Sequence, residues 1–280
     1  MFRLQRDELF HVWDLGPAMT SILPFALVRR WMALVDPAIR RAVIAADLQE
    51  IEAASLARFF EYVLDHRDQA AARCAYLDTV IVMFETDAAV RSLRRDVTAR
   101  LAQSSRRPVF AFLSDAPDGR KPATSQERAY DFEEVPSGVR KARARRPDLD
   151  TLMRITADPD PAVIRILLEN PKATEDHAVR VAALRPQTPG NFLEVLRSRF
   201  GTRERVQAAL VENPFCPVRL AVALTPLLLR SRLEEIQRAS LLDERVREAA
   251  RCLLEENLRD EKPPPVERKD DLSGPAGPER

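Results

Sequence analysis

Residues 158–170 read DPDPAVIRILLEN, and this stretch contains a complete helix together with its start and stop signals. Asp160 can accept hydrogen bonds from the open backbone N–H groups of the first turn, and Pro161 suits the first helical position. Asn170 precedes Pro171, and a residue before proline is pushed out of the helical conformation. The stretch therefore predicts a short helix with a sharp corner at each end.

The same ending returns downstream, which indicates a repeat. Glu-Asn-Pro recurs at 212–214, after a second run of matching apolar spacing. Val163, Val206 and Val246 occupy equivalent positions and lie 43 and 40 residues apart by subtraction. This spacing is typical of helical solenoids of the HEAT and armadillo size class. The residues expected to form structural corners are Asp160, Pro161, Asn170, Pro171, Asn213 and Pro214.

Asn170 and Asn213 are candidates for a structural role at these corners. Each lies where a helix ends with unsatisfied carbonyl groups. An asparagine amide can donate to such groups, while the proline that follows fixes the turn. The alternative is that these amides contact a ligand. We favour the structural interpretation.

The composition favours helices throughout the chain. The 280 residues include only seven glycines, whereas alanine, leucine, arginine and glutamate are abundant. Strand and turn architectures need more glycine and more alternating β-branched residues. We therefore predict an all-α protein in which a HEAT-like α-solenoid follows an N-terminal helical domain.

Changes in sequence character divide the chain into four segments. They are an N-terminal helical domain at 1–103, a linker at 104–138, helical repeats at 139–258 and a disordered tail at 259–280. The linker combines proline, glycine and mixed charge without periodicity, and the tail is charged and proline-rich. The apolar run VFAFL at 109–113 is an exception within the linker. It can dock on a neighbouring helix or pair as a lone strand, and the sequence does not decide between the two.

Five helices are expected in the first segment. Apolar spacing places them at 24–35, from Asp36-Pro37, from Asp47, at about 67–84 and at about 87–103. Aromatic residues at these spacings are expected to pack in the core instead of lining a ligand pocket; they are Phe59, Phe60, Tyr62, Tyr76 and Phe84. A repeat cannot bury its apolar face alone, so we predict that these helices pack against the repeat array or extend it.

Charge and hydropathy exclude several broad classes of function. The chain has 44 basic and 43 acidic side chains, so no global field would draw it to nucleic acid or an anionic membrane. The first residues lack the apolar core of a secretion signal, and the longest apolar run, at 19–35, is interrupted by Arg29-Arg30. The three cysteines are far apart and are expected to be small buried hydrophobes. We therefore expect a cytoplasmic protein without a membrane span.

A basic segment at 139–146 is the main candidate for binding. It carries Arg140, Lys141, Arg143, Arg145 and Arg146 within seven residues. Such a cluster could grip phosphate groups, or it could form a solvated helix face that contacts protein. We favour the second interpretation, because no aromatic residues alternate with the charges to stack on bases.

Motifs for catalysis are not found. The chain has no GxGxxG, GxxxxGK[ST], GxSxG or HExxH run, and His11, His66 and His177 are dispersed. His177, beside Asp176 near a helix start, is expected to be a satisfied surface histidine and not a catalytic base. We predict a protein that is not an enzyme and that uses no cofactor and no metal.

The repeat motifs resemble those of bacterial leucine-rich-repeat-variant and HEAT-like α-solenoids. The resemblance covers about residues 140–257. It rests on Arg-Arg-Pro-Asp at 145–148, Asp-Pro-Asp-Pro-Ala-Val at 158–163, the two Glu-Asn-Pro corners, and the helix ends Ala-Leu-Arg-Pro and Ala-Leu-Thr-Pro. The resemblance implies a solenoid fold. Some leucine-rich-repeat-variant proteins hold an iron–sulfur cluster on clustered cysteines, and that feature is not carried over because the cysteines here are not clustered.

Two functions are compatible with this pattern. The first is a non-enzymatic scaffold whose curved helical surface binds a protein partner, with the basic segment tuning the contact. The alternative is a nucleic-acid-binding protein, related to DNA repair, that uses a cationic concave face. Arginines on the repeats would supply that charge if they converged. Those expected to take part in either function are Arg165, Arg180 and Arg219, with Arg154, Arg197, Arg199, Arg203 and Arg205 added for nucleic acid.

Overall fold

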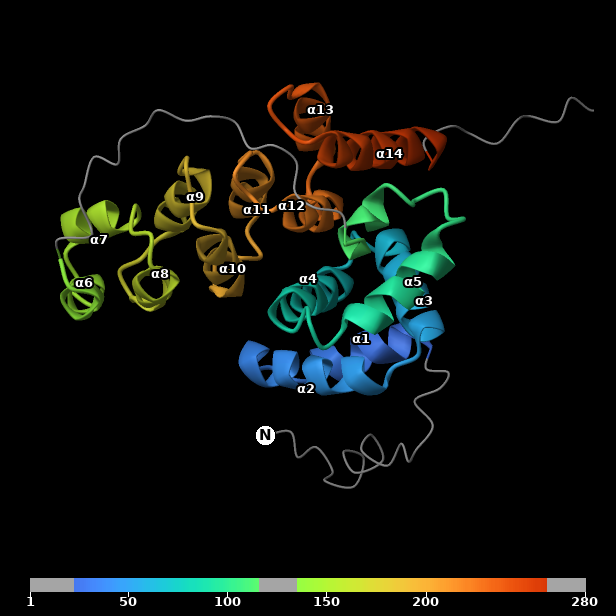
Figure 1. The fold of residues 1–280 in the computed structure, drawn as a ribbon, viewed down its shortest axis with the longest axis horizontal. Helices are drawn as coiled ribbons and strands as arrows, with labels where there is room; N and C mark the ends of the chain where they lie inside the picture. The colour runs from blue at the N-terminus through green and yellow to red at the C-terminus, as the bar shows by residue number, and fades with distance from the viewer. Residues whose placement is uncertain (1–22, 116–134, 261–280) are drawn as a thin grey trace, which may run out of the picture.

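The computed structural model describes residues 23–115 and 135–260, and Figure 1 shows the arrangement of their helices. Within these ranges the chain forms α-helices and short 3-10 helices joined by turns, with no strand. The predicted all-α class is confirmed.

The N-terminal helices are α1 (Pro24–Met32), α2 (Pro37–Glu50), α3 (Ala53–Asp65), α4 (Ala70–Glu85) and α5 (Arg91–Leu101). The prediction that a helix begins at Asp47 is wrong, because Asp47 lies inside α2. Its carboxylate does not cap a helix. It accepts hydrogen bonds from Trp31 Nε1 at 2.7 Å and Arg30 Nη2 at 3.0 Å, so it joins α2 to α1.

Aromatic side chains form the centre of the N-terminal core. Trp31 and Phe59 lie edge to face with ring centroids 5.1 Å apart, and Phe60 contacts Phe112 in the same way at 5.6 Å. Phe59, Phe60 and Tyr76 are buried as predicted. The other two members of the predicted set, Tyr62 and Phe84, are only partly buried at the edge of this core.

The apolar run at 109–113 forms a 3-10 helix, η4 (Val109–Leu113), that docks on other helices. Val109, Phe110, Phe112 and Leu113 are buried, and η4 contacts α5 and two helices of the C-terminal half. Residues 104–115 are therefore part of the folded body, although they were expected to begin a linker. Residues 116–134 of that expected linker lie outside the described part of the chain, as does the expected tail from residue 261 onward.

The C-terminal half consists of short helices. They are α6 (Ser137–Ala144), α7 (Leu149–Ile155), α8 (Pro161–Glu169), α9 (Glu175–Ala183), α10 (Pro189–Arg197), α11 (Glu204–Val211), α12 (Val218–Leu224), η5 (Thr225–Leu227), α13 (Arg230–Arg238) and α14 (Glu244–Asp260). Helix α6 packs on α8, α8 on α10, and α9 on α11, so alternate helices stack in two rows (Figure 1). These two rows are called the repeat array, or the array, below. Apolar side chains facing between the rows, such as Val163 and Val206, are completely buried.

The predicted corner residues bind neighbouring helix ends. The side chain of Asn170, which follows α8, donates to Ala144 O at 2.8 Å and to Arg146 O at 2.9 Å, at the end of α6. Asn213, which follows α11, donates to Ala182 O at 2.7 Å and Leu184 O at 2.8 Å, at the end of α9. In both cases the amide satisfies carbonyl groups that a helix end leaves open. These contacts are those expected from the structural interpretation of the two asparagines.

The helix start at Asp160 also follows the expectation. The Asp160 carboxylate accepts from Ala162 N at 2.9 Å, and Pro161 occupies the first turn of α8. Ser137 Oγ donates to the same carboxylate at 2.9 Å. Asp160 therefore caps α8 and ties it to the start of α6.

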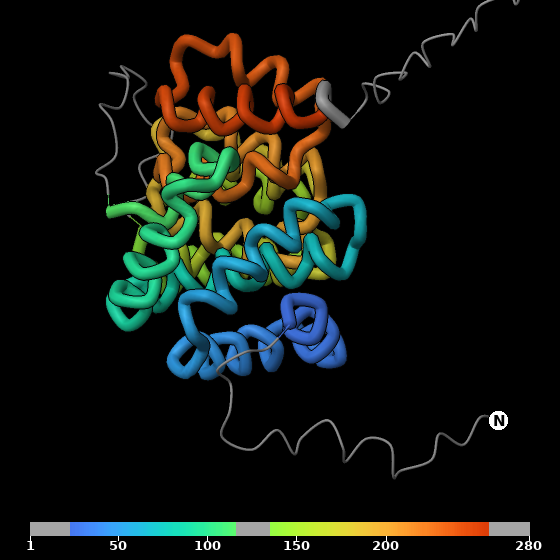
Figure 2. Tube along the Cα trace, turned by 90° about the vertical axis from the view of Figure 1, so that its right-hand side faces the viewer, coloured from blue at the N-terminus to red at the C-terminus, as the bar shows by residue number. Residues whose placement is uncertain are grey.

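The N-terminal helices pack against the repeat helices, as predicted. Tyr76 on α4 is buried and donates from its hydroxyl to Ala223 O at 2.7 Å, and Arg73 Nη2 donates to Leu227 O at 2.9 Å. Helix α4 also contacts α10, so it takes the place next to α10 in one row of the array (Figure 1). Figure 2 shows α1 and α2 at one side of the molecule and α13 and α14 at the opposite side, with the other helices between them.

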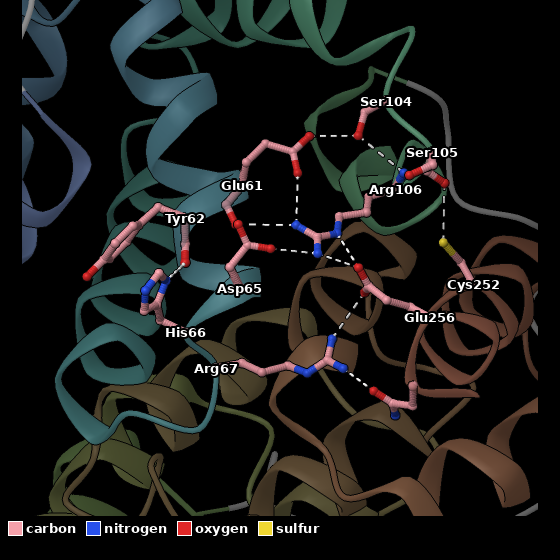
Figure 3. Close-up of polar contacts among 11 residues, drawn as sticks. Glu61, Tyr62, Asp65, His66, Arg67, Ser104, Ser105, Arg106, Cys252 and Glu256 are labelled. Carbon is pink, nitrogen blue, oxygen red and sulfur yellow. Dashed lines mark hydrogen bonds and ion pairs between the residues drawn. The ribbon is translucent and has the colours of Figure 1, made fainter. Parts of the chain in front are cut away.

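An ion-pair network joins the last helix, α14, to residues 23–115, which form the N-terminal body (Figure 3). Arg106 lies among three carboxylates. Its Nη2 lies 2.7 Å from Asp65 Oδ1, its Nη1 lies 3.1 Å from Glu61 Oε2, and its Nε donates to Glu256 Oε1 at 2.6 Å. Glu256 also pairs with Arg67 at 3.4 Å. The neighbouring carboxylates raise the pKa of Arg106, although burial alone would lower it. Helix α14 is thus held to the N-terminal body by charge, and it also contacts η4.

Candidate binding groove

A groove lies between α2 of the N-terminal body and α8 and α10 of the repeat array. Its volume is about 730 Å³. The lining residues are Ala38, Arg41, Ala42, Ala45, Glu85, Arg165, Leu168, Glu169, Glu194, Arg197, Ser198 and Arg199. Because its two walls come from distant parts of the sequence, the groove exists only when the N-terminal body and the array are in contact.

Ion pairs between the two halves fix one part of this groove. Arg197 on α10 pairs with Glu85 at the end of α4, and its Nη1 lies 2.7 Å from Glu194 Oε1. These opposite charges hold the pKa of Arg197 above its ordinary value, whereas desolvation by burial acts in the opposite direction. Glu194 is buried, and its Oε2 has no hydrogen-bond partner among the described residues. One carboxylate oxygen of Glu194 is therefore buried without a donor in the described part of the chain.

Two other groove arginines are also held in place. Arg199 Nη2 donates to Asn170 O and Ala173 O, both at 2.9 Å, and its guanidinium lies 4.9 Å from the ring centroid of Phe200. Arg41 Nη1 lies 3.5 Å from Asp78 Oδ1. In contrast, Arg165 and Glu169 on α8 are exposed and form no ion pair within the described ranges. The charges free to meet a partner are therefore one cation and one anion.

The α2 wall of the groove is made of small side chains. Ala38 and Ala42 are exposed and Ala45 is half-buried, so a partner can approach the α2 backbone closely. Two exposed apolar residues lie near this wall: Ile39 is on α2, and Val35 comes just before the helix. A helix whose surface is built of alanine with large apolar residues beside it is suited to contact another polypeptide.

The structure separates the predicted binding residues. Arg165 lies in the groove, whereas the basic segment lies on α6 and just after it, at the far end of the array (Figure 1). Arg145, Arg146 and Arg180 are exposed, and Lys141 is half-buried. Within the described ranges these residues do not gather in one groove.

Two of the predicted binding arginines hold the fold together. Arg140 pairs with the buried carboxylate of Asp158, and Arg219 donates from Nε to Phe112 O at 2.8 Å. Arg219 also lies 3.1 Å from Asp87 and over the ring of Phe84. Arg219 therefore links α12 to the N-terminal body, and its charge is not free for a partner.

Sequence reasoning did not identify the residues that α2 and α4 contribute to the groove. Arg41 and Glu85 have no motif around them. The sequence signal for this wall is that alanines occupy positions 38, 42 and 45 of a helix, where polar residues would be usual on an exposed face. Their proximity to α8 and α10 follows only from the tertiary structure.

His177 differs from the expectation of a surface histidine, because it is buried at 3% exposure. Its Nδ1 accepts from the backbone N of Thr174 at 3.1 Å and so caps the start of α9. The Nε2 atom has no hydrogen-bond partner among the described residues. Burial lowers the pKa of His177 below its ordinary value of 6.5, while nearby Asp176 raises it. The neutral ring is the form that supports the helix.

This geometry predicts a pH-dependent part of the stability. Because the folded-state pKa is lowered, the stabilisation is complete above about pH 6.5 and is lost as the pH falls from there toward the folded-state pKa. His177→Gln keeps an acceptor for Thr174 N and does not titrate, so its urea-unfolding free energy should fall less than that of the wild type between pH 7.5 and 5. A His177→Gln protein with an unchanged slope would contradict the assignment.

Comparison of the chain with protein-family models, with curated proteins and with solved structures finds no match. Among the described residues, no group of three or more histidine, cysteine, aspartate or glutamate side chains is placed to hold a metal ion. A search of the same residues finds no helix with the length and apolar character required to cross a membrane.

Proposed function

We propose that this protein is a non-enzymatic scaffold of the HEAT-like helical-repeat type that binds a protein partner in the cytoplasm. The partner segment occupies the groove between α2 and the helices α8 and α10. It carries an acidic side chain that meets Arg165 and a basic side chain that meets Glu169. The observation that carries the proposal is the mixed charge of the groove, with four arginines and three glutamates around an alanine-rich wall.

The charge distribution favours a protein partner over nucleic acid. A phosphate backbone is bound by cations that converge and are free to replace counterions. Three of the four groove arginines are instead engaged: Arg197 by carboxylates, Arg199 by backbone carbonyl groups and Arg41 by Asp78. Arg205, another candidate for DNA contact, pairs with Asp176 at 3.0 Å. Alternating signs of charge are the arrangement expected of a surface that selects a polypeptide.

Photo-crosslinking in the native host tests this proposal. A benzoylphenylalanine residue placed at Ala42 should crosslink to a partner protein, because Ala42 is exposed in the groove wall. The same residue placed at Ala71, exposed at the start of α4 and outside the groove lining, is the control and should give no adduct. The double charge reversal Arg165→Glu with Glu169→Lys should remove most of the adduct at position 42.

Two results would contradict the proposal. One is equal crosslinking from positions 42 and 71, which would mean that the groove is not the contact surface. The other is binding to random duplex DNA that falls steeply as salt is raised, which would favour the nucleic-acid function. Fluorescence anisotropy with a labelled duplex at low and high salt provides that measurement, and we expect little binding at either.

A further inference from the structure

A second, smaller cavity lies between α6 and α7, at the first helices of the array. Its volume is about 260 Å³. The lining residues are Val135, Arg140, Arg143, Thr151, Arg154, Ile155 and Asp158. The volume is below the usual range for drug-sized ligands, so the cavity suits a small molecule.

Three arginines give this cavity the character of an anion site. Arg140 is held in one orientation, because its Nη1 pairs with Asp158 Oδ1 and its Nε donates to Val135 O at 3.1 Å. Arg143 and Arg154 form no ion pair within the described ranges, although both line the cavity. Guanidinium groups without a carboxylate partner are suited to bind a phosphate or carboxylate group through charge-assisted hydrogen bonds.

A buried carboxylate in the cavity wall adds a second requirement. Asp158 is 0% exposed. Its Oδ1 is occupied by Arg140 and by the backbone N of Asp160 at 2.9 Å, but its Oδ2 has no hydrogen-bond partner among the described residues. A buried carboxylate oxygen without a donor is costly, so this wall favours a molecule that brings an N–H or O–H group.

We propose that the cavity between α6 and α7 binds a small organic anion that also carries a hydrogen-bond donor. The anionic group lies between Arg143 and Arg154, and an ammonium or hydroxyl group of the same molecule lies beside Asp158. The chemical class is a phosphate ester of an amino acid or of a hydroxy acid. This site is separate from the groove and does not depend on the proposed protein partner.

Isothermal titration calorimetry with the full chain tests the site with three probes. O-phospho-L-serine has both the phosphate group and an ammonium donor, inorganic phosphate lacks the ammonium group, and L-serine lacks the phosphate. We expect O-phospho-L-serine to bind about tenfold more tightly than phosphate, and L-serine to show no measurable binding.

Arginine variants identify the cavity as the place of binding. Arg143→Gln and Arg154→Gln should each weaken O-phospho-L-serine binding by about tenfold or more. Arg145→Gln is the matched control, since Arg145 is exposed and does not line the cavity. Circular dichroism and the melting temperature of each variant show whether the fold is retained.

Failure of O-phospho-L-serine to bind the wild-type chain would overturn the proposal, as would unchanged affinity in the Arg143→Gln, Arg154→Gln double variant. Phosphate binding as tightly as O-phospho-L-serine would overturn the role given to Asp158. Crosslinking from position 42 is a separate readout, so failure at this cavity leaves the groove proposal distinguishable.

Discussion

Gly201→Ala is expected to destabilise the protein by about 3 kcal/mol, which is at the upper end of the usual cost of overpacking a core. Gly201 is buried in the turn between α10 and α11. A Cβ atom at this position would overlap the backbone oxygen of Leu196 and would lie 2.7 Å from its carbonyl carbon. Because the obstacle is backbone at the end of α10, it cannot rotate away. Urea unfolding followed by circular dichroism measures the change.

Gly138→Ala is the matched control for that substitution. Gly138 lies in α6, and a Cβ atom built there meets no atom within 4 Å. Alanine restricts the unfolded chain and suits a helix, so this variant should be more stable than the wild type by about 0.5–1 kcal/mol. If both variants lost stability equally, the close approach at Gly201 would not be the cause.

Asn213→Ala should cost about 2–4 kcal/mol of unfolding free energy. The substitution removes two hydrogen bonds to Ala182 O and Leu184 O, together with the one that Asn213 Oδ1 accepts from Phe215 N at 3.0 Å. Asn213 is 1% exposed, so water does not readily replace these partners. The same urea-unfolding measurement applies, and partner crosslinking from position 42 should persist in the folded variant.

Asn170→Ala provides an internal comparison. Asn170 makes the same pattern of contacts one repeat earlier, with two carbonyl acceptors and the backbone N of Lys172 at 2.9 Å. We expect a loss of similar size. An unchanged unfolding free energy in both variants would show that the corners do not depend on their asparagines.

The local features of the fold could be predicted from the sequence because their signals lie within a few residues. Asp160 and Pro161 mark the start of α8, and Asn170 marks its end. The boundary between α2 and α3 was predicted wrongly, because Asp47 resembles a capping residue. Its carboxylate instead accepts hydrogen bonds from Trp31 and Arg30 on α1. Such a tertiary contact leaves no signal in the sequence around Asp47.

The site could be predicted only in part. Arg165 was expected to bind, and it lies in the groove. The residues of the opposite wall of the groove lie on α2, more than a hundred residues earlier in the chain, and no spacing rule relates the two walls. Arg219 is likewise an arginine on a helix of the C-terminal half, yet it is engaged by Phe112 O and Asp87. Which arginines are free depends on where the N-terminal body docks.

The N-terminal helices and the repeat helices form one body, and the groove lies at their junction. Thermal unfolding of residues 139–260, compared with the full chain, tests this claim most directly. We predict that the fragment melts at a lower temperature and less cooperatively, because Ala223 O, Leu227 O and the buried face around them lose their partners on α4. A fragment that melted as sharply and at the same temperature as the full chain would contradict it.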